Sequence, residues 1–427
     1  MVLLGVMILI HELGHYWACL AVGVRVQTFS IGFGPRLFGF RRGETDFRIS
    51  AIPFGGYVRM FGEQPGDEAA ADPNSFQAKS RWRRAIVIIA GPLMNIVLAV
   101  GIMTGIFMNE FPKQVTVTNP IIGKVIPGSP AEKAGVHDGD RIVQIGGIAN
   151  PNWQDIQAKE ALNADRPLPV TIEREGKRLS LTVIPQRDKE EGIGIAGWVG
   201  ESDVVISQLT SGLNAVKAGL KPGDLLVSAN GQQIRSTVKL QEVIQNSQSN
   251  PVDLIISRDG HLKRFSVTPI KNGDTDGQWR IGVALSPKMT LVQLPFGEAL
   301  VESAQFNRRN ATLIFQVLES IVERRISATT LEGPIQIAQR SREAAKEGAT
   351  SFLGLMAIVS LNLAIFNLLP IPILDGGVLM LLLIEMVIRR DMSLQIKEAV
   401  FKVGFVFLMM IVVFVLYNDI SKMFSRG

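Results

Sequence analysis

The sequence predicts a polytopic α-helical membrane protein, with about four transmembrane helices and two tandem β-rich domains outside the membrane. Of its 427 residues, 47% are hydrophobic and 19% are charged, whereas soluble proteins average about 25% charged residues. Long uncharged runs lie near both ends of the chain, and the β-rich middle contains an internal repeat. This composition excludes a fully soluble or disordered chain.

Uncharged runs locate the membrane helices, because roughly 20 apolar residues span a bilayer. Ala85–Asn109 is 25 residues long and Gly348–Leu374 is 27. Pro370 and Pro372 cannot continue a regular helix, so the latter helix should end near Leu369. We therefore predict a second membrane helix at 85–109 and a third, with its following turn and helix, at 348–390.

Two further segments complete the membrane part. Val403–Asn418 has 16 uncharged residues, which Lys402 can lengthen by snorkelling, and this predicts a fourth helix at 398–420. The first helix is predicted at 1–24. Only ten residues precede His11, which is short for a complete spanning helix. We therefore expect a few more residues before it. A signal peptide is a poor interpretation because no basic region precedes the apolar run.

Basic residues in the short loops set the expected orientation. The loop 25–84 carries ten Lys and Arg residues, and Arg389, Arg390 and Lys397 follow the third helix. Both loops should therefore be cytoplasmic, which places both termini and the long middle on the opposite side. The 44 basic residues are too dispersed for a nucleic-acid-binding surface, so no nucleic-acid partner is expected.

The middle of the chain contains two similar copies. SPAEKAGVHDGDRIVQIGG begins at Ser129 and LNAVKAGLKPGDLLVSANG begins at Leu213, with matching residues 84 positions apart. Two copies predict tandem domains at 115–198 and 199–290 rather than a solenoid. Their A-G-[VL]-x-x-G-D string resembles PDZ domains, which bind extended peptides by strand addition. Peptide binding and a purely steric role as spacer or filter remain equal alternatives.

Two other segments border the membrane. Residues 25–84 are predicted to be a β-rich loop of several short strands, which by itself would be a cytoplasmic hairpin. Residues 296–347 are predicted to be amphipathic and helical, with apolar residues near helical spacing. This segment lies either on the membrane surface or against the PDZ-like domains.

HELGH, at residues 11–15, indicates a metal site. Positions i and i+4 of a helix share one face, so His11 and His15 can bind one zinc ion while Glu12 acts as general base. Inserting one charged residue at the centre of a bilayer costs roughly 2.5–3.5 kcal/mol. Three neighbouring polar residues in an apolar membrane segment are therefore costly, which argues against a purely structural role.

A catalytic zinc ion needs a third protein ligand and an open position. His137 and His261 lie in the middle of the chain and are poor candidates. Asp375 follows 27 uncharged residues and the proline-broken turn, which would return it towards the helices, with Gly376 and Gly377 permitting close approach. The alternative is that Asp375 only caps the next helix.

Together, HELGH, the NLLPIPILDGG string and the repeats resemble the site-two protease family of intramembrane metalloproteases, across nearly the whole chain. The resemblance implies that His11, His15 and Asp375 bind zinc, that Glu12 is catalytic and that Asn367 holds substrate or the oxyanion. The segment Gly91–Asn95 (GPLMN) resembles the family's second-helix motif, in which small residues permit close packing. Val378 departs from the family pattern, in which histidine is frequent.

The resemblance also implies the substrates and the location. An enzyme of this family cleaves single-span membrane proteins, such as an anti-sigma factor or remnant signal peptides, after another protease has trimmed them. The resemblance further implies that the loop 25–84 is a hairpin that dips back into the membrane, and we expect an edge strand at 55–60 to pair with the unwound substrate. We expect a multi-pass protein of the bacterial inner membrane, with its active site towards the cytoplasm and its PDZ-like domains and termini in the periplasm. The alternatives are a non-catalytic scaffold that presents PDZ domains and a membrane-anchored zinc protease that acts on soluble proteins.

Overall fold

The computed structural model describes residues 2–63, 72–109, 111–114, 120–188, 192–210, 212–271, 277–330 and 333–425. These residues form two compact units. The membrane unit consists of Met1–Glu110, Gln293–Phe315 and Leu331–Gly427, and the β-rich unit consists of Phe111–Val292 and Gln316–Thr330. The first residues of the predicted 115–198 domain, 115–119, lie outside the described part of the chain.

Four helices of the membrane unit are long and apolar enough to cross a membrane. They are α1 (Val2–Val22), α2 (Arg81–Met108), α9 (Ala349–Leu368) and α11 (Leu394–Ser425). The four predicted membrane helices are thus present, but α2 begins four residues before Ala85. Its first turn takes in three arginines of the predicted loop, because long basic side chains can keep their charge outside the apolar layer.

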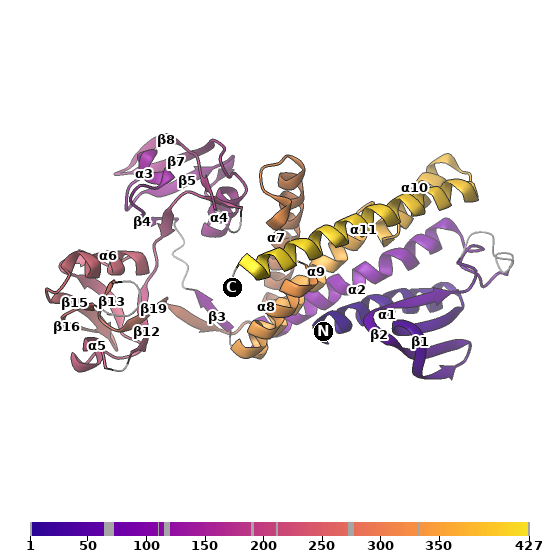
Figure 1. Cartoon of the computed structure of the whole chain (residues 1–427), viewed down its shortest axis with the longest axis horizontal. Coiled ribbons are helices and arrows are strands. Elements are labelled where there is room, and N and C mark those ends of the chain that lie inside the picture. The colour runs from indigo at the N-terminus through magenta and orange to yellow at the C-terminus, as the bar shows by residue number, and fades with distance from the viewer. Residues whose placement is uncertain are drawn as a thin grey trace. The chain divides into compact units, whose positions relative to one another are not determined.

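Helices α1 and α2 pack closely because glycine lies at their contact. A Cβ atom on Gly14 would come within 2.3 Å of the carbonyl oxygen of Ala90, and one on Gly91 within 2.3 Å of His15 Nε2. Either clash would push the helices apart. α9 also packs against α2, and the three helices run side by side (Figure 1). Gly91 thereby brings α2 against the HELGH face of α1.

The turn after α9 returns the chain to the bundle. α9 ends at Leu368, as its prolines predicted, and α10 (Asp375–Ile388) begins with the predicted third ligand. A Cβ atom on Gly376 would lie 2.2 Å from the carbonyl oxygen of Leu368 at the end of α9, and one on Gly377 2.2 Å from that of Ile371 in the turn. The expected close approach at these glycines is therefore confirmed. Asp375 is the first residue of α10 and not its N-cap, which is Leu374.

The loop after α1 folds into two long strands, β1 (Val26–Arg42) and β2 (Thr45–Met60), instead of the several short strands expected. Register shifts bend both, so that β1 residues 28–31 pair with 56–59 and also with 46–49. In the described part of the chain, the last segment of β2, residues 56–60, pairs with a strand on one side only. The two strands lie beside α1 (Figure 1). Phe29 and Val58 belong to the same buried cluster as Cys19 of α1.

The predicted amphipathic segment 296–347 is divided into separate helices. They are α7 (Phe296–Val322), the 3-10 helix η2 (Ala328–Thr330) and α8 (Pro334–Glu347). Ser303 of α7 donates to the carbonyl oxygen of Val100 in α2 at 2.8 Å. This places the start of α7 against the membrane unit.

The β-rich unit repeats one order of elements twice, at the predicted offset of 84 residues. The first copy contains β4 (Ile122–Val125), α3 (Pro130–Lys133), β5 (Arg141–Ile145), β6 (Ile148–Ala149), α4 (Trp153–Ala161), β7 (Leu168–Arg174), β8 (Lys177–Val183), β9 (Gln186–Arg187), β10 (Gly194–Ile195) and β11 (Trp198–Gly200). The second contains β12 (Val204–Leu209), α5 (Asn214–Lys217), β13 (Leu225–Ala229), β14 (Gln232–Gln233), α6 (Thr237–Ser247), β15 (Val252–Arg258), β16 (His261–Val267), β17 (Ile270–Lys271), β18 (Trp279–Arg280) and β19 (Val283–Pro287). β3 (Phe111–Gln114) pairs with β20 (Met289–Val292) beside them.

Each copy has its own sheet, core and internal ion pair. The strand orders are β6-β5-β7-β8 and β16-β15-β13-β12-β19, and the buried clusters are separate. Asp140 is buried and accepts two hydrogen bonds from Arg174, at 2.7 and 2.8 Å. Asp224 accepts two from Arg258 at 2.6 and 2.7 Å. The duplicated string of the sequence therefore corresponds to a duplicated fold.

Candidate metal centre

Three side chains from two helices converge inside the membrane unit. His11 and His15 of α1 and Asp375 of α10 offer one ligand atom each, and all three atoms lie within 4.8 Å of one another. The Nε2 atoms of the histidines are 3.2 Å apart. Asp375 lies 3.1 Å from His11 Nε2 and 3.6 Å from His15 Nε2. The structure thus brings together all three residues predicted to bind the metal.

These separations fit a zinc ion. Bonds of about 2.0–2.2 Å in tetrahedral geometry place ligand atoms roughly 3.3–3.6 Å apart. Two imidazoles and one carboxylate are also the usual donor types of a catalytic zinc site, which leaves its fourth position open. In the described part of the chain, this is the one cluster of at least three His, Cys, Asp or Glu residues close enough to hold a metal.

A carbonyl of α2 orients His15. Nδ1 of His15 lies 2.8 Å from the carbonyl oxygen of Val87. A carbonyl oxygen can only accept, so Nδ1 carries the proton and Nε2 keeps a lone pair for the metal. Hydrogen bonds of this kind fix the tautomer and ring orientation of metal ligands.

Two asparagine side chains flank His11. Asn95 Nδ2 lies 3.4 Å from His11 Nδ1, and Asn367 Nδ2 lies 3.4 Å from His11 Nε2. The buried Oδ1 atom of Asn95 has no hydrogen-bond partner among the residues that the structure describes. A metal on His11 Nε2 would leave the proton on Nδ1, and rotation of the Asn95 amide would then give that proton an acceptor. The orphaned oxygen therefore fits a metal at this site.

Glu12 and Asn367 lie in the same cavity as the three ligands. The cavity has a volume of about 810 Å³ and is lined by residues from α1, α2, α9, α10, α11 and the end of β2. Glu12 lies beside β2, because a Cβ atom on Gly56 would be 3.5 Å from its Cγ. The general-base candidate therefore borders both the metal ligands and the single-paired end of the sheet.

The remaining sequence candidates fall as expected. His137 and His261 lie in the β-rich unit and take no part in the cluster. Val378 is part of the cavity wall and has no ligand atom. Its departure from the family pattern thus changes the wall and leaves the metal-binding set intact.

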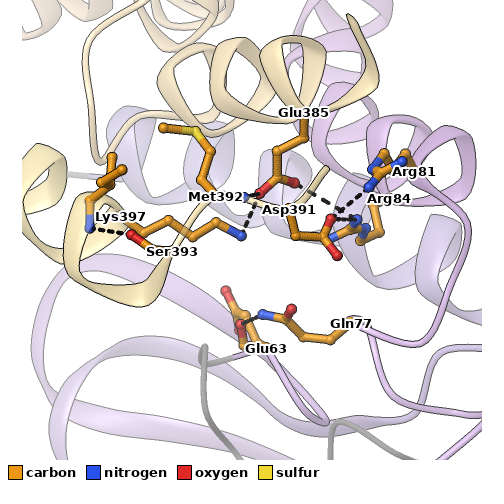
Figure 2. Close-up of polar contacts among 10 residues, drawn as sticks. Glu63, Gln77, Arg81, Arg84, Glu385, Asp391, Met392, Ser393 and Lys397 are labelled. Atoms are coloured by element: carbon orange, nitrogen blue, oxygen red, sulfur yellow. Dashed lines mark hydrogen bonds and ion pairs between the residues drawn. The ribbon is translucent and has the colours of Figure 1, made fainter. Parts of the chain in front are cut away.

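A group of charged residues at one end of the cavity was not found from the sequence. Arg84, Glu385 and Lys397 line this end, and Arg81 and Asp391 lie beside them (Figure 2). Arg84 and Lys397 were counted only as markers of orientation. The missed signal was Glu385, a carboxylate in the apolar helix α10 that has to be paired if it is buried.

Comparison with known proteins identifies the family. Residues 1–411 match the sequence model of peptidase family M50. The chain belongs to peptidase family M50. This confirms the resemblance predicted from HELGH and the Asp375 motif, and it makes the protein a zinc metalloprotease of the intramembrane type.

Relatives of this M50 peptidase match it over almost their whole length. The regulator of sigma-E protease RseP of Salmonella typhimurium is 29% identical, covering 98% of this chain and 97% of that protein. RseP of Escherichia coli is also 29% identical, covering 99% and 97%. A Vibrio cholerae protein whose name places it among zinc metalloproteases is 29% identical, covering 98% and 97%.

A solved structure resembles a small part of the chain. The PDZ domain of an SdrC-like protein from Listeria monocytogenes matches 20% of the chain and 90% of that domain, with 17% identity and a TM-score of 0.18. This likeness is too slight to assign a fold to the repeats.

Proposed function

We propose that this M50 peptidase cleaves peptide bonds inside the membrane-spanning segments of single-span proteins of the anti-sigma-factor or remnant-signal-peptide type. The supporting observation is the placement of His11, His15 and Asp375 in a cavity among helices that are apolar enough to cross a membrane. A zinc protease acting on soluble proteins would need a solvated site instead. A scaffold without activity would have no use for the ligand set.

Five residues carry the proposed mechanism. His11, His15 and Asp375 hold zinc, which when bound supplies Lewis-acid activation of water and of the peptide carbonyl. The Glu12 carboxylate accepts a proton from the attacking water and returns it to the leaving amine nitrogen. The Asn367 amide donates an N–H group to the carbonyl oxygen as negative charge develops there.

The end of β2 is the proposed docking edge for substrate. A membrane helix must unwind before its carbonyls can react, and its freed backbone groups then need partners. Residues 56–60 line the cavity beside Glu12 and, among the residues described, pair with a strand on one side only. Arg59→Pro should therefore reduce cleavage, whereas Leu37→Pro, on the exposed outer segment of β1, should have a smaller effect. Unchanged cleavage by Arg59→Pro would refute strand addition.

The proposed topology follows the basic loops. We place the protein in the bacterial inner membrane, with the start of α2 towards the cytoplasm and the termini and β-rich unit in the periplasm. The two repeats, 115–198 and 199–290, are assigned as PDZ-like domains that limit access, so that substrates must first lose bulky external domains. Peptide capture by their grooves is the second assignment, and binding of carboxyl-terminal peptides would favour it.

One comparison tests the function. A single-span substrate with a trimmed external tail is incubated with the native chain and with Glu12→Gln in mild detergent, and products are mapped by mass spectrometry. We expect cleavage within the span by the native chain and a loss of about 10²–10⁴-fold in Glu12→Gln. Equal cleavage by both would remove Glu12 from the mechanism. Cleavage of casein, with the membrane substrate left intact, would favour the soluble-substrate alternative.

A further inference from the structure

Arg84, in the first turn of α2, has a buried guanidinium without a hydrogen-bond partner in the described part of the chain. The residue is 8% exposed and its side chain lines the cavity. Its Nε atom has no hydrogen-bond partner within the described ranges. Its two ion pairs, with Glu385 and Asp391, are both 3.9 Å long. Neither is short enough to be a hydrogen bond.

Both nearby carboxylates have closer partners (Figure 2). Glu385 lies 2.6 Å from Lys397 Nζ and accepts the backbone N–H of Met392 at 3.0 Å. Asp391 lies 2.8 Å from Arg81. Three cations therefore share two carboxylates, and Arg84 is the cation with the weakest partners.

Glu63, another carboxylate on the cavity wall, does not supply the missing anion. Glu63 accepts the backbone N–H of Met60 at 3.2 Å, and no ion pair joins it to Arg84 among the described residues. Arg59 also lines the cavity, so it adds a further cation there and not an anion. A buried, weakly paired guanidinium is costly, and its planar fork of donors matches a carboxylate.

The distance between Arg84 and the metal ligands sets how many residues from the scissile bond a substrate side chain must lie to contact Arg84. Arg84 lies two helical turns before Gly91, the position at which an added Cβ atom would meet both histidines. Two turns of α2 span about 10 Å. An extended peptide advances about 3.3 Å per residue, so three residues cover the same length.

We propose that Arg84 is a specificity-determining residue, which binds an acidic side chain of the substrate about three residues from the scissile bond. The inference rests on the proposed function, because the scissile bond has to lie at the three metal ligands. A substrate segment drawn through the cavity would place its carboxylate against the free donors of Arg84. An acidic residue at that position would thus speed cleavage of an otherwise equal substrate.

The test uses the full-length protein and a single-span substrate whose cleavage site has been mapped. Asp is placed singly at the second, third and fourth positions on each side of the scissile bond, with Asn at the same position as the isosteric reference. The measured quantity is the ratio of kcat/KM for the Asp and Asn substrates. We expect the Asp substrate to have about ten times the kcat/KM of the Asn substrate at one position, at or next to the third residue from the scissile bond. A charge-assisted hydrogen bond stabilises by enough for a factor of this size.

Variants assign that preference to Arg84. Arg84→Gln should bring the ratio to about one, and Arg84→Glu should invert the preference in favour of Lys. Arg83→Gln is the matched control, because it removes the same charge from an exposed neighbouring residue, and it should keep the native ratio. A preference retained in Arg84→Gln would overturn the proposal.

The native protein decides the proposal even if the variants do not fold. A ratio near one at all six positions, with cleavage intact, would overturn the inference and leave the proposed function standing. No Glu12-dependent cleavage of any substrate would instead refute the proposed function. Added phosphatidylglycerol tests whether a lipid headgroup occupies the site instead. If it inhibits cleavage of the Asp and Asn substrates equally, and Arg84→Gln abolishes this inhibition, the site binds a lipid headgroup and the inference is overturned.

Discussion

The Nδ1 atom of His15 lies 2.8 Å from the carbonyl oxygen of Val87, 72 residues further along the chain. Helix α2 provides no metal ligand, yet one face of it supports the site. Val87, Gly91 and Asn95 recur at intervals of four residues, as positions on one helix face do. They respectively orient His15, make room for both imidazoles and flank His11.

Gly91→Ala should weaken metal binding. The added methyl group would lie 2.3 Å from His15 Nε2 and 2.9 Å from His11 Cε1, so the imidazoles would have to move. We expect metal affinity to fall by at least about 10–100-fold, as when outer-shell support is lost. Zinc titration of the apo-protein measures this loss.

Gly101→Ala is the matched control in the same helix, because nothing lies within 4 Å of its added Cβ. Alanine is the better helix former by about 0.5–1 kcal/mol, so zinc binding and cleavage should stay native. Equal loss of zinc affinity in both variants would mean that helix α2 as a whole, and not contact at Gly91, is responsible.

Asp375→Asn should release zinc. The substitution keeps the shape of the side chain and removes the charge that faces both histidines at 3.1 and 3.6 Å. Changing a residue that only supports a ligand lowers metal affinity by roughly 10–100-fold. Because Asp375 is a ligand itself, we expect zinc affinity to fall by at least this factor, together with loss of cleavage. Elemental analysis of purified protein measures zinc content, with Asp391→Asn as control. Full zinc content in Asp375→Asn would refute its assignment as a ligand.

Asp419→Ala should loosen α8. The carboxylate, which is completely buried in α11, accepts N–H groups from Gly333, Ile335 and Gln336 at the start of α8. Loss of such a cap costs about 0.5–2 kcal/mol. Hydrogen exchange should therefore speed up in the first turn of α8.

Gly333→Ala should disturb the same contact from the other side. Its Cβ would lie 2.4 Å from Asp419 Oδ2, whereas a Cβ on Gly354 of α9 would meet nothing within 4 Å. Gly354→Ala is therefore the control. Native exchange rates in α8 for both Asp419→Ala and Gly333→Ala would show that this contact does not hold the helix.

The second repeat should lose stability in acid through Asp224. Burial alone would raise the pKa of Asp224, but hydrogen bonds from Arg258 and from the backbone of Lys221 lower it below its ordinary value of 3.8. A carboxyl group with a lowered folded-state pKa stabilises the fold above the unfolded-state pKa and ceases to do so as pH falls through the folded-state value. Stability should therefore fall below about pH 4.

Asp224→Asn tests the source of this dependence. Removing the buried charge should cost about 3 kcal/mol at neutral pH, and the loss between neutral and acid pH should become smaller. Hydrogen exchange of β13 and β15, corrected for intrinsic rates, reports both effects. Asp253→Asn, in an exposed pair with Arg264, should behave like the native chain. An unchanged acid response in Asp224→Asn would exclude Asp224 as its source.

Much of the site could be predicted from the sequence because its signals are local. His11 and His15 share a helix face by spacing alone, and a bilayer leaves few reasons for polar residues within apolar runs. Asp375 was found in the same way, by its position after an apolar run and before two glycines. The two repeats were evident because matching glycines and aspartates recur 84 residues apart.

Only the tertiary structure decided which distant groups support these residues. The carbonyl of Val87 and the guanidinium of Arg84 have no local signature, because any helix presents carbonyls and any basic loop contains arginines. The GPLMN string contains Asn95 but did not indicate that its amide would lie beside His11. The roles of these groups arise when glycine contacts bring α1 and α2 together and the turn before α10 returns Asp375. The ligand set follows from helical periodicity and polarity, whereas the surrounding polar groups depend on packing between segments that are far apart in the chain.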